Sequence, residues 1–372
     1  MENFILKTLI NTDIESELNK IGFDKSYLAK ASNKFKYKTF KIFDLTIPQA
    51  NILKQTALSF GADCGVHRDV LVNKIEKTDV ILGGSYSQII KICEKLKQQP
   101  FSLKILAHNI LSLIEKENKK TKIVGILNIT PDSFSDGGQY FDEKNAIQHL
   151  YQLIEDGADI IDIGAESTKP FSHSISTEEQ IKRLSLVIKE ISNINIPISI
   201  DTKNSEVADF ALNNGAQIIN DVSGGNYDPK IFNIVTKYNA TIILQHSTEK
   251  TENIINYKDI VEDVYKSLYL KIKLAEDCGI KNIICDPGIG FGKTKKQNFE
   301  ILERIEEFYS LKKPTMIGIS RKSLLGHPEN NNNNLKDSLS LALAYPLIKS
   351  GIDYIRVHNV KLHKTLLEIQ DC

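Results

Sequence analysis

Val124-Gly-Ile-Leu-Asn128 is the first of eight short apolar runs, each ending in one or two polar residues able to hold a ligand. The other seven lie at residues 160–165, 197–201, 218–221, 241–246, 283–286, 315–320 and 354–358. Near-continuous β-branched runs of this length suit parallel strands that are covered on both faces, and the segments between them are long enough for crossover helices. Eight such units predict a (β/α)8 barrel, the TIM-barrel fold.

The segments between the runs support this prediction. Residues 258–277 and 335–349 carry apolar residues at three- and four-residue spacing, which is the pattern of amphipathic helices outside a barrel. Glycine is the residue that most readily ends a helix in the left-handed conformation. Four of the runs are preceded by such a glycine, namely Gly157, Gly215, Gly279 and Gly351. We therefore expect helix, glycine turn and strand to follow one another at these places.

The polar ends of the runs locate the expected active site. In TIM barrels the active site lies at the C-terminal ends of the strands, because the loops that follow the strands meet there. The residues that fall at this end are Asn128, Asp201, Asn220, Asp286, Ser320, Arg356 and His358. They are our candidates for binding and catalysis.

The length of the chain implies a second domain. A barrel needs about 250 residues, and the chain has 372. We expect a small N-terminal α/β domain at residues 1–120 and the barrel at residues 121–372. Within the first domain we expect strands at 38–45 and 79–83, and helices at 48–60, 85–96 and 103–114. The segment 61–68 holds His67 and Arg68, which could line a site, but we favour a loop with a structural histidine.

Composition argues against several classes of protein. The 47 basic and 47 acidic residues balance, so charge gives no reason to expect a nucleic acid or an anionic membrane surface as partner. No apolar stretch approaches the ~20 residues of a membrane span, and residues 1–20 lack the features of a signal peptide, so we expect a cytosolic protein. The five cysteines show no Cys-x-x-Cys spacing, which argues against a disulfide framework and a structural zinc site.

Five motifs stand at the ends of the expected strands. They read Asn128-Ile-Thr-Pro-Asp-Ser-Phe-Ser-Asp-Gly-Gly138, Glu166-Ser-Thr-Lys-Pro170, Asp286-Pro-Gly-Ile-Gly-Phe-Gly-Lys-Thr294, Ser320-Arg-Lys-Ser323 and Arg356-Val-His358. Together they resemble dihydropteroate synthase over residues 121–370, and their shared order makes a chance match improbable. The resemblance implies a transferase of folate biosynthesis that joins p-aminobenzoate to 6-hydroxymethyl-7,8-dihydropterin pyrophosphate, releasing pyrophosphate with the help of Mg²⁺. It also implies small-molecule substrates and a homodimer.

The expected pterin site combines chemistry with this resemblance. A pterin ring presents N–H donors and a carbonyl acceptor, which carboxylates and amides on rigid strands can bind. Asp201, Asn220 and Asp286 supply such groups and match the family's pterin-contacting positions. Lys322 resembles the lysine that reaches the pterin carbonyl. Helix capping is the alternative role for aspartate and asparagine at strand ends, and three matches on different strands make it the minor one.

Pyrophosphate is an anion, so its departure needs cations and hydrogen-bond donors. Arg356 and His358 lie two residues apart on one strand and face the same side, where they can bind pyrophosphate and stabilise charge as the C–O bond breaks. With Lys322 they are the expected catalytic residues. Asn128 resembles the residue that binds Mg²⁺ through its amide oxygen, alongside phosphate oxygens and water. Since no nucleophile is needed, we expect an SN1-like displacement through a delocalised dihydropterin cation.

The resemblance also locates the second substrate. It implies that p-aminobenzoate lies among Thr168, Pro170, Phe291 and Ser323, with its carboxylate near the Ser323 hydroxyl. Loops 132–138 and 167–174 resemble two mobile loops that close over the site and order this substrate.

Several positions depart from the family's pattern. Ala165, Lys169 and Phe171 replace a glycine, an arginine and a glycine in the second loop. Lysine keeps the charge but loses the bidentate fork, and phenylalanine removes backbone freedom, so we expect weaker binding of p-aminobenzoate. Gln245 replaces the methionine of a Met-His pair, and Asn359 stands where aspartate is common.

Three other functions were weighed. Residues 288–294 look like a phosphate-binding loop, but the required first glycine is Pro287, so we set an ATPase aside. A methyltransferase-type pterin barrel, which passes a methyl group from methyltetrahydrofolate to a corrinoid protein, shares the strand-end aspartate and asparagine. The motifs at 130–137, 320–323 and 356–358 favour the pyrophosphate-releasing enzyme. A non-catalytic folate-binding or scaffolding protein is suggested by the loop departures and the N-terminal domain.

Overall fold

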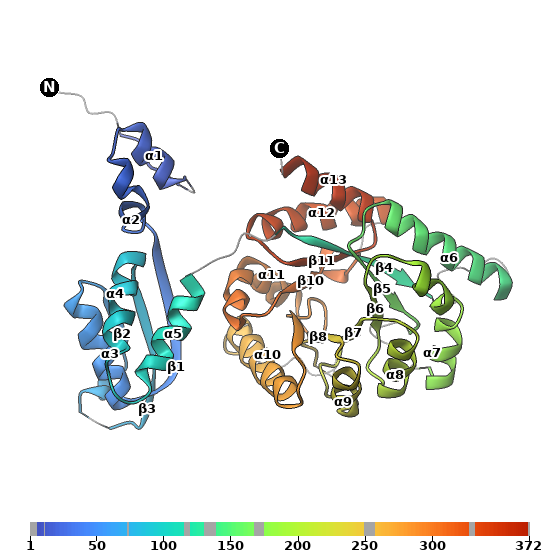
Figure 1. Cartoon of the computed structure of the whole chain (residues 1–372), viewed down its shortest axis with the longest axis horizontal. Helices are drawn as coiled ribbons and strands as arrows, with labels where there is room; N and C mark the ends of the chain where they lie inside the picture. The colour runs from blue at the N-terminus through green and yellow to red at the C-terminus, as the bar shows by residue number, and fades with distance from the viewer. Residues whose placement is uncertain are drawn as a thin grey trace. The chain divides into compact units, whose positions relative to one another are not determined.

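The chain divides into two compact units, Met1–Glu117 and Asn118–Cys372, in a computed structural model (Figure 1). The structure describes residues 6–10, 12–72, 74–114, 120–129, 139–166, 175–248, 257–326 and 332–370. The division falls close to residue 120, where we placed the boundary from the sequence. Each unit has its own apolar core, so each is described by itself.

The second unit is the TIM barrel that the sequence predicts. Its strands are β4 (Lys122–Asn128), β5 (Ile160–Gly164), β6 (Ile198–Asp201), β7 (Ile218–Asp221), β8 (Thr241–Gln245), β9 (Asn282–Asp286), β10 (Met316–Gly318) and β11 (Tyr354–Val357). They pair in parallel in the order β10-β11-β4-β5-β6-β7-β8-β9. A parallel bridge between Cys285 and Thr315 joins the two ends of this order, and the Cys285 N–H donates to the Pro314 carbonyl at 2.8 Å. The ring of strands is thereby closed.

Helices surround these strands in Figure 1. The α-helices are α6 (Gln139–Glu155), α7 (Thr177–Leu184), α8 (Ser205–Asn213), α9 (Lys230–Lys237), α10 (Ile260–Asp277), α11 (Lys295–Glu303), α12 (Asn333–Lys349) and α13 (Val360–Gln370). Short 3-10 helices are η4 (Ile188–Asn193), η5 (Ile305–Leu311) and η6 (Ser323–Leu325). The two helices expected from spacing are α10 and α12. All four predicted helix-ending glycines have φ between 80° and 99°, which confirms their left-handed conformation.

Two apolar layers pack on opposite faces of the barrel strands. The larger cluster lies between strands and helices and includes Ile161, Ile200 and Ile242. The smaller cluster joins side chains of different strands inside the barrel: Val124, Ile160, Ile218, Ile243, Ile284 and Met316. Successive side chains of a strand alternate between faces, so the residue two positions further along each strand also points inward. The polar strand ends therefore stand directly above an apolar layer.

The first unit is a small α/β domain built on an antiparallel sheet of order β1-β3-β2. Its elements are α1 (Ile14–Lys20), η1 (Lys25–Tyr27), α2 (Leu28–Ser32), β1 (Tyr37–Thr46), α3 (Ile47–Ser59), β2 (Asp63–Val66), η2 (Arg68–Val70), β3 (Lys77–Ser85), α4 (Tyr86–Leu96) and α5 (Leu103–Ile114). The five elements expected from the sequence are present as β1, α3, β3, α4 and α5. Leu53, Leu82 and Ile92 are among the side chains at the centre of its core.

The sequence missed five short elements of this unit, namely β2, the helices α1 and α2, and the 3-10 helices η1 and η2. β2 lies in the segment 61–68 that we expected to be a loop, because its four residues include a glycine and pair only through tertiary contact with β3. The helices α1 and α2 escaped because they bury few side chains, Leu18 in the first and Ala31 and Ser32 in the second. His67 is 50% exposed, and its Nδ1 accepts the Asp69 N–H at 3.2 Å. It caps η2, which agrees with the structural role that we favoured.

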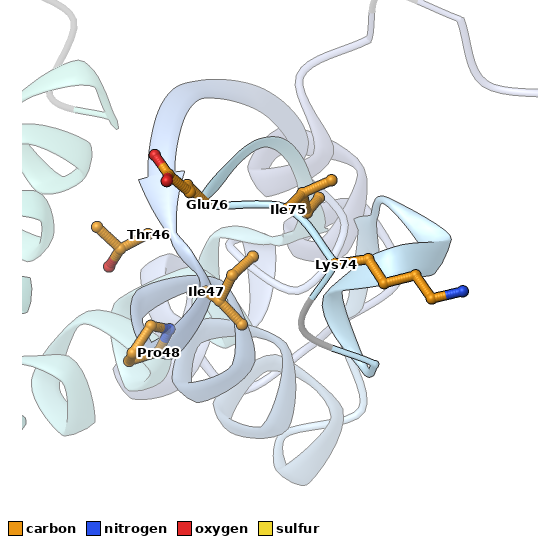
Figure 2. A pocket seen from close by; sticks show the side chains of 6 residues that line it. All are labelled: Thr46, Ile47, Pro48, Lys74, Ile75 and Glu76. Atoms are coloured by element: carbon orange, nitrogen blue, oxygen red, sulfur yellow. The ribbon is translucent and has the colours of Figure 1, made fainter.

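An open cavity of about 340 Å³ also lies in the first unit. It is lined by Thr46, Ile47, Pro48, Lys74, Ile75 and Glu76 (Figure 2). Among the described residues, none of these six carries a buried polar atom that lacks a hydrogen bond. We therefore assign no ligand to this cavity. Across both units, none of the helices in the described ranges combines the length and apolarity that a membrane crossing requires.

Candidate active site

Six polar side chains line the C-terminal end of the barrel interior. They are Asp162, Asp201, Asn220, Gln245, Asp286 and Arg356, and we call them the polar layer. Most follow by two positions a residue of the inner apolar cluster or of its border, so the pleat of the strands directs them inward. All are buried except Arg356, whose side chain is 15% exposed. The layer is therefore a closely packed set of charged and amide groups with one partly open face.

Arg356 links three strands of this layer. Its Nε donates to Asp162 Oδ2 at 2.6 Å and its Nη2 donates to Asp201 Oδ2 at 3.0 Å. Asn220 Nδ2 donates to the same oxygen of Asp162 at 3.0 Å. Burial raises the pKa of Asp201 to about 7, and the Arg356 guanidinium opposes this shift. One guanidinium thus balances two buried carboxylates, which leaves the cluster short of positive charge and hydrogen-bond donors.

Asp162 was not among our expected site residues. It lies in the middle of Ile160-Ile-Asp-Ile-Gly164, is fully buried, and holds both Arg356 and Asn220. A buried carboxylate requires a cation or several donors. The aspartate inside an otherwise apolar strand was therefore a signal in the sequence that could have revealed it.

Lys322 and Asp286 form the opposite side of the layer. Lys322 Nζ donates to the Ile289 carbonyl at 2.6 Å and lies 4.7 Å from the centre of the Phe291 ring. Burial lowers the pKa of Lys322 to about 8, against the attraction of the Asp286 carboxylate. Burial likewise raises the pKa of Asp286, and Lys322 opposes that shift. Gly290 makes room for this lysine, since a Cβ there would lie 3.2 Å from Lys322 Cδ. The structure thus brings Lys322 together with Asp286 and with Phe291.

Capping of helices and turns was the alternative role for the aspartates and asparagines at the strand ends. In the structure this role is mostly filled by neighbours of the predicted site residues. The cap of α8, which follows β6, is Asn204 and not Asp201. After β7 it is Asp221, not Asn220, that accepts the backbone N–H groups of Ser223 and Gly225. Asp286 does not cap a helix either, since Thr294 caps α11; its Oδ1 accepts the Gly288 N–H at 2.7 Å in the turn after β9. Asp201 and Asn220 are therefore available for a ligand.

His358 was expected to bind pyrophosphate together with Arg356. Its Nδ1 lies 3.0 Å from Ser320 Oγ, and its backbone N–H donates to that same oxygen at 3.2 Å. Burial, with Arg321 and Arg356 nearby, lowers the pKa of His358 to about 3. The imidazole is consequently neutral near pH 7. It can donate a hydrogen bond, but it brings no positive charge to the site.

Arg321 and Asn359 hold the loop after β10 in place. Arg321 forms a bidentate pair with Asp337 of α12, at 2.7 and 2.8 Å, and Asn359 Nδ2 donates to Asp337 Oδ2 at 3.2 Å. Asn359, a departure from the family's pattern, thereby acquires a structural role. Ser323 follows on η6 with an exposed side chain, so its hydroxyl is open to solvent.

A second buried lysine, Lys293, was not among the site residues expected from the sequence. Lys293 Nζ donates to the carbonyls of His246 at 3.2 Å, Gly288 at 2.8 Å and Phe291 at 3.2 Å. Burial lowers its pKa to about 7. At Gly288 a Cβ would collide with the His246 carbonyl, which explains the glycine in this packed loop. Because the amine is engaged by backbone carbonyls, it is a positioning group for the loop that carries Phe291 and not a phosphate-loop lysine.

Asn128 ends β4 at the same side of the barrel. Gly164 leaves space for its side chain, since a Cβ on that glycine would lie 3.3 Å from Asn128 Oδ1. Among the described residues no group of three or more histidine, cysteine, aspartate or glutamate side chains could hold a metal ion. The amide oxygen of Asn128 is a hard oxygen donor of the kind that Mg²⁺ accepts alongside phosphate oxygens and water.

Part of the expected site lies outside the described residues. This applies to Thr168 and Pro170, to the departures Lys169 and Phe171, and to both loops at 132–138 and 167–174. Ala165 is described and buried in the core, and its carbonyl accepts Arg183 Nη1 at 3.1 Å. The alanine at this position is thus explained by packing.

The polar layer carries buried atoms that have no hydrogen-bond partner in the described part of the chain. The acceptors are Asp162 Oδ1, Asp201 Oδ1 and Asn220 Oδ1, and the donor is Gln245 Nε2. Leaving a buried polar group unpaired costs roughly 1–3 kcal/mol. A set of such atoms on one inward-facing layer indicates a ligand with several N–H donors and at least one acceptor.

The chain matches known proteins along the barrel. A family model described as pterin binding enzyme matches residues 124–358. A dihydropteroate synthase of Clostridium beijerinckii is 42% identical over 248 residues, which cover 65% of this chain and 90% of that protein. A solved dihydropteroate synthase from Clostridium difficile, determined in the presence of pteroic acid, has a TM-score of 0.65 and 38% identity, covering 69% of this chain and 98% of that one.

A longer relative also matches part of the first unit. A probable bifunctional folylpolyglutamate synthase/dihydropteroate synthase of Haloferax volcanii is 34% identical over 347 residues. The match covers 84% of this chain and 40% of that protein, so this chain spans well under half of that relative's length. The second unit alone is too short to supply the matched share of this chain, so the similarity extends into Met1–Glu117.

Proposed function

This chain belongs to the dihydropteroate synthase family of pterin binding enzymes, and we propose that it joins p-aminobenzoate to 6-hydroxymethyl-7,8-dihydropterin pyrophosphate with release of pyrophosphate. The observation that carries the proposal is the polar layer, with unpaired acceptors on β5, β6 and β7 above an apolar base. A flat heterocycle with N–H groups along its edge satisfies these acceptors. Its faces can contact the apolar base and the ring of Phe291.

Pterin binding follows from the hydrogen-bonding capacity of each group. Asp201 and Asn220 keep one buried oxygen unpaired, and Asp286 retains the lone pairs that Gly288 does not use. These oxygens can accept the ring N–H groups. Lys322 has three amine hydrogens, of which the Ile289 carbonyl takes one, so it can also donate to the pterin carbonyl.

The leaving group is bound by donors that the carboxylates hold in place. Asp162 and Asp201 engage Nε and Nη2 of Arg356, while Nη1 has no partner in the described part of the chain. We assign Nη1 to pyrophosphate. The Ser320 hydroxyl can donate to Nδ1 of His358, which leaves the proton of the neutral ring on Nε2. We assign this Nε2–H to pyrophosphate as a second donor. Asn128 would hold Mg²⁺, which supplies charge neutralisation for the phosphate oxygens when bound.

The reaction itself needs no protein nucleophile. The C–O bond to pyrophosphate breaks, and the electron pair leaves with the phosphate oxygen while the dihydropterin ring delocalises the positive charge. The amine of p-aminobenzoate then forms the new C–N bond and loses one proton. The enzyme contributes by orienting the two substrates and by stabilising the departing anion. Phe291, Ser323, Thr168 and Pro170 are the residues that we assign to p-aminobenzoate.

Two broader expectations stand as proposals on the strength of the family resemblance. We propose that the protein forms a homodimer and that it works in the cytoplasm. The methyltransferase-type barrel is disfavoured because the matching relatives named for their activity include dihydropteroate synthases. A non-catalytic role is disfavoured because the expected site residues that are described gather at one end of the barrel.

The 372-residue protein should be assayed with both substrates and Mg²⁺ by measuring dihydropteroate and pyrophosphate in the same reaction. We expect both products in equal amounts. The isosteric change Asp286→Asn should lower kcat/KM by about 10²-fold, since the carboxylate beside Lys322 is lost. Asp228→Asn, which changes a helix-capping carboxylate elsewhere on the barrel, should leave kcat/KM near wild type. Methyl transfer from methyltetrahydrofolate to a corrinoid protein, without pyrophosphate release, would overturn the proposal.

A further inference from the structure

Among the described residues, Gln245 is the one member of the polar layer with a fully buried donor that lacks a hydrogen-bond partner. It is the last residue of β8, is 3% exposed, and the donor is its Nε2. The other fully buried unpaired atoms of the layer are oxygens of Asp162, Asp201 and Asn220. A ligand that satisfies those oxygens donates hydrogen bonds, whereas a ligand that satisfies Gln245 accepts one. The two requirements are met together by a heterocycle whose edge carries both N–H groups and acceptor atoms.

The backbone and stem of Gln245 are held in place before any ligand binds. Its carbonyl accepts Lys271 Nζ at 3.0 Å, and its neighbour in the parallel ladder is Asp286. A Cβ at Gly288 would lie 3.3 Å from Gln245 Cγ, so the loop after β9 packs closely against the stem of this side chain. Fixing the stem of a side chain reduces the entropy that is lost when its polar end binds. The Gln245 amide is consequently a preorganised hydrogen-bond donor.

The direction of the side chain places this donor within the site. Ile243, two positions earlier on β8, belongs to the apolar cluster inside the barrel, whereas Ile242 and Leu244 belong to the outer core. By the two-residue repeat of a strand, Gln245 points inward with Ile243. It therefore stands above the same apolar base as Asn220 and Asp286.

We propose that Gln245 is a specificity-determining residue that donates a hydrogen bond from Nε2 to an acceptor atom on the pterin ring. The inference rests on the proposed function, because it assigns one further contact to the same site. A glutamine here replaces the methionine of the family's pattern, so a contact that methionine makes through packing becomes a directed hydrogen bond in this chain. A site that has a buried donor discriminates against ligands that lack the matching acceptor, since the donor then stays unpaired.

The decisive variant is Gln245→Met, which restores the family's side chain and removes the donor at similar length. Calorimetric titration should show about tenfold weaker binding of hydroxymethyl-dihydropterin pyrophosphate, the size expected for one hydrogen bond. The KM for p-aminobenzoate should stay near wild type. The melting temperature of the ligand-free variant should be equal to or higher than that of the wild type, because the variant no longer buries an unpaired group.

Gln217→Met is the matched control. Gln217 lies before β7 at the opposite end of the barrel, and both ends of its amide are paired, with the Ile198 N–H and the Gly215 carbonyl, each at 2.7 Å. This change should lower the melting temperature and leave pterin affinity unchanged. A structural role for Gln245 would give the same pattern as Gln217, and either that result or unchanged pterin affinity in Gln245→Met would overturn the inference. Failure of the wild-type protein to bind the pterin would instead overturn the proposed function.

Discussion

The first unit buries three polar side chains among its described residues, Ser32, Thr56 and Thr78, and none of them is charged. The barrel buries five aspartates among its own described residues: Asp162, Asp201, Asp221, Asp286 and Asp337. In the described parts of the chain, every buried side-chain nitrogen or oxygen without a hydrogen bond belongs to the barrel unit, and several lie in the polar layer. Both units have well-packed apolar cores, so packing does not distinguish them.

This difference shows where a binding site is built into the chain. Unpaired buried groups oppose folding, so each calls for an explanation such as a functional role or a bound ligand, ion or water. By this criterion the polar layer, at the C-terminal end of the barrel, is suited to bind a polar ligand. Among the described residues of the first unit, including those that line its cavity at Thr46 to Glu76, no buried side-chain nitrogen or oxygen lacks a hydrogen bond.

The largest effect is expected from Arg356→Met. The change leaves Asp162 and Asp201 buried without their cation, which should cost about 3–5 kcal/mol of folding free energy. It also removes the proposed pyrophosphate donor, so kcat/KM should fall by about 10³-fold or more. The control Arg68→Met changes an arginine of the first unit whose side chain is 90% exposed, and it should alter neither property. Urea unfolding measures the free energy of unfolding, and steady-state kinetics measures kcat/KM. Similar losses in the two variants would contradict the contrast between the units.

A smaller effect concerns pH. Burial lowers the pKa of His246 and of His358 to about 3, whereas an unfolded chain binds these protons below about pH 6.5. On these two histidines the unfolded state therefore holds more protons between these values, so their contribution to stability should fall as pH falls from about 6.5 towards about 3. His246→Gln should flatten this fall, and His108→Gln, an exposed histidine of the first unit, should not. Urea unfolding of each variant at several pH values in this window measures the slope. An identical slope in His246→Gln and wild type would contradict the assignment.

The smallest effect compares the same motif in the two units. Ser85 begins α4 and Thr294 begins α11, and each forms a capping box with a glutamine three residues later. Replacing either residue by alanine should cost about 1 kcal/mol of local stability, measurable by hydrogen exchange of the helix that follows. Only Thr294→Ala should also raise the KM for p-aminobenzoate, because Thr294 follows the loop that carries Phe291 and Lys293. An equal rise in KM for Ser85→Ala would show that the first unit influences the site.

Much of the barrel could be predicted from the sequence because its signals are local. A strand covered on both faces must be apolar along its length, and a turn in the left-handed conformation favours glycine. Each run and its polar end could therefore be recognised in the sequence. Asn128, Asp201, Asn220 and Asp286 lie at the ends of their strands as expected. β2 could not be predicted from the sequence, because the formation of a four-residue strand depends on its partner strand more than on its own composition.

The sequence by itself determined the eight strands, the side of the barrel at which polar groups gather, and the family to be expected. Only the tertiary structure decided how those groups are paired. Arg356 binds aspartates that precede it by 194 and 155 residues, His358 is neutral because it is buried beside two arginines, and Lys293 is engaged by three carbonyls. Pairing and burial depend on distances that exist only once the ring of strands closes, and the charge state of a buried group depends on both.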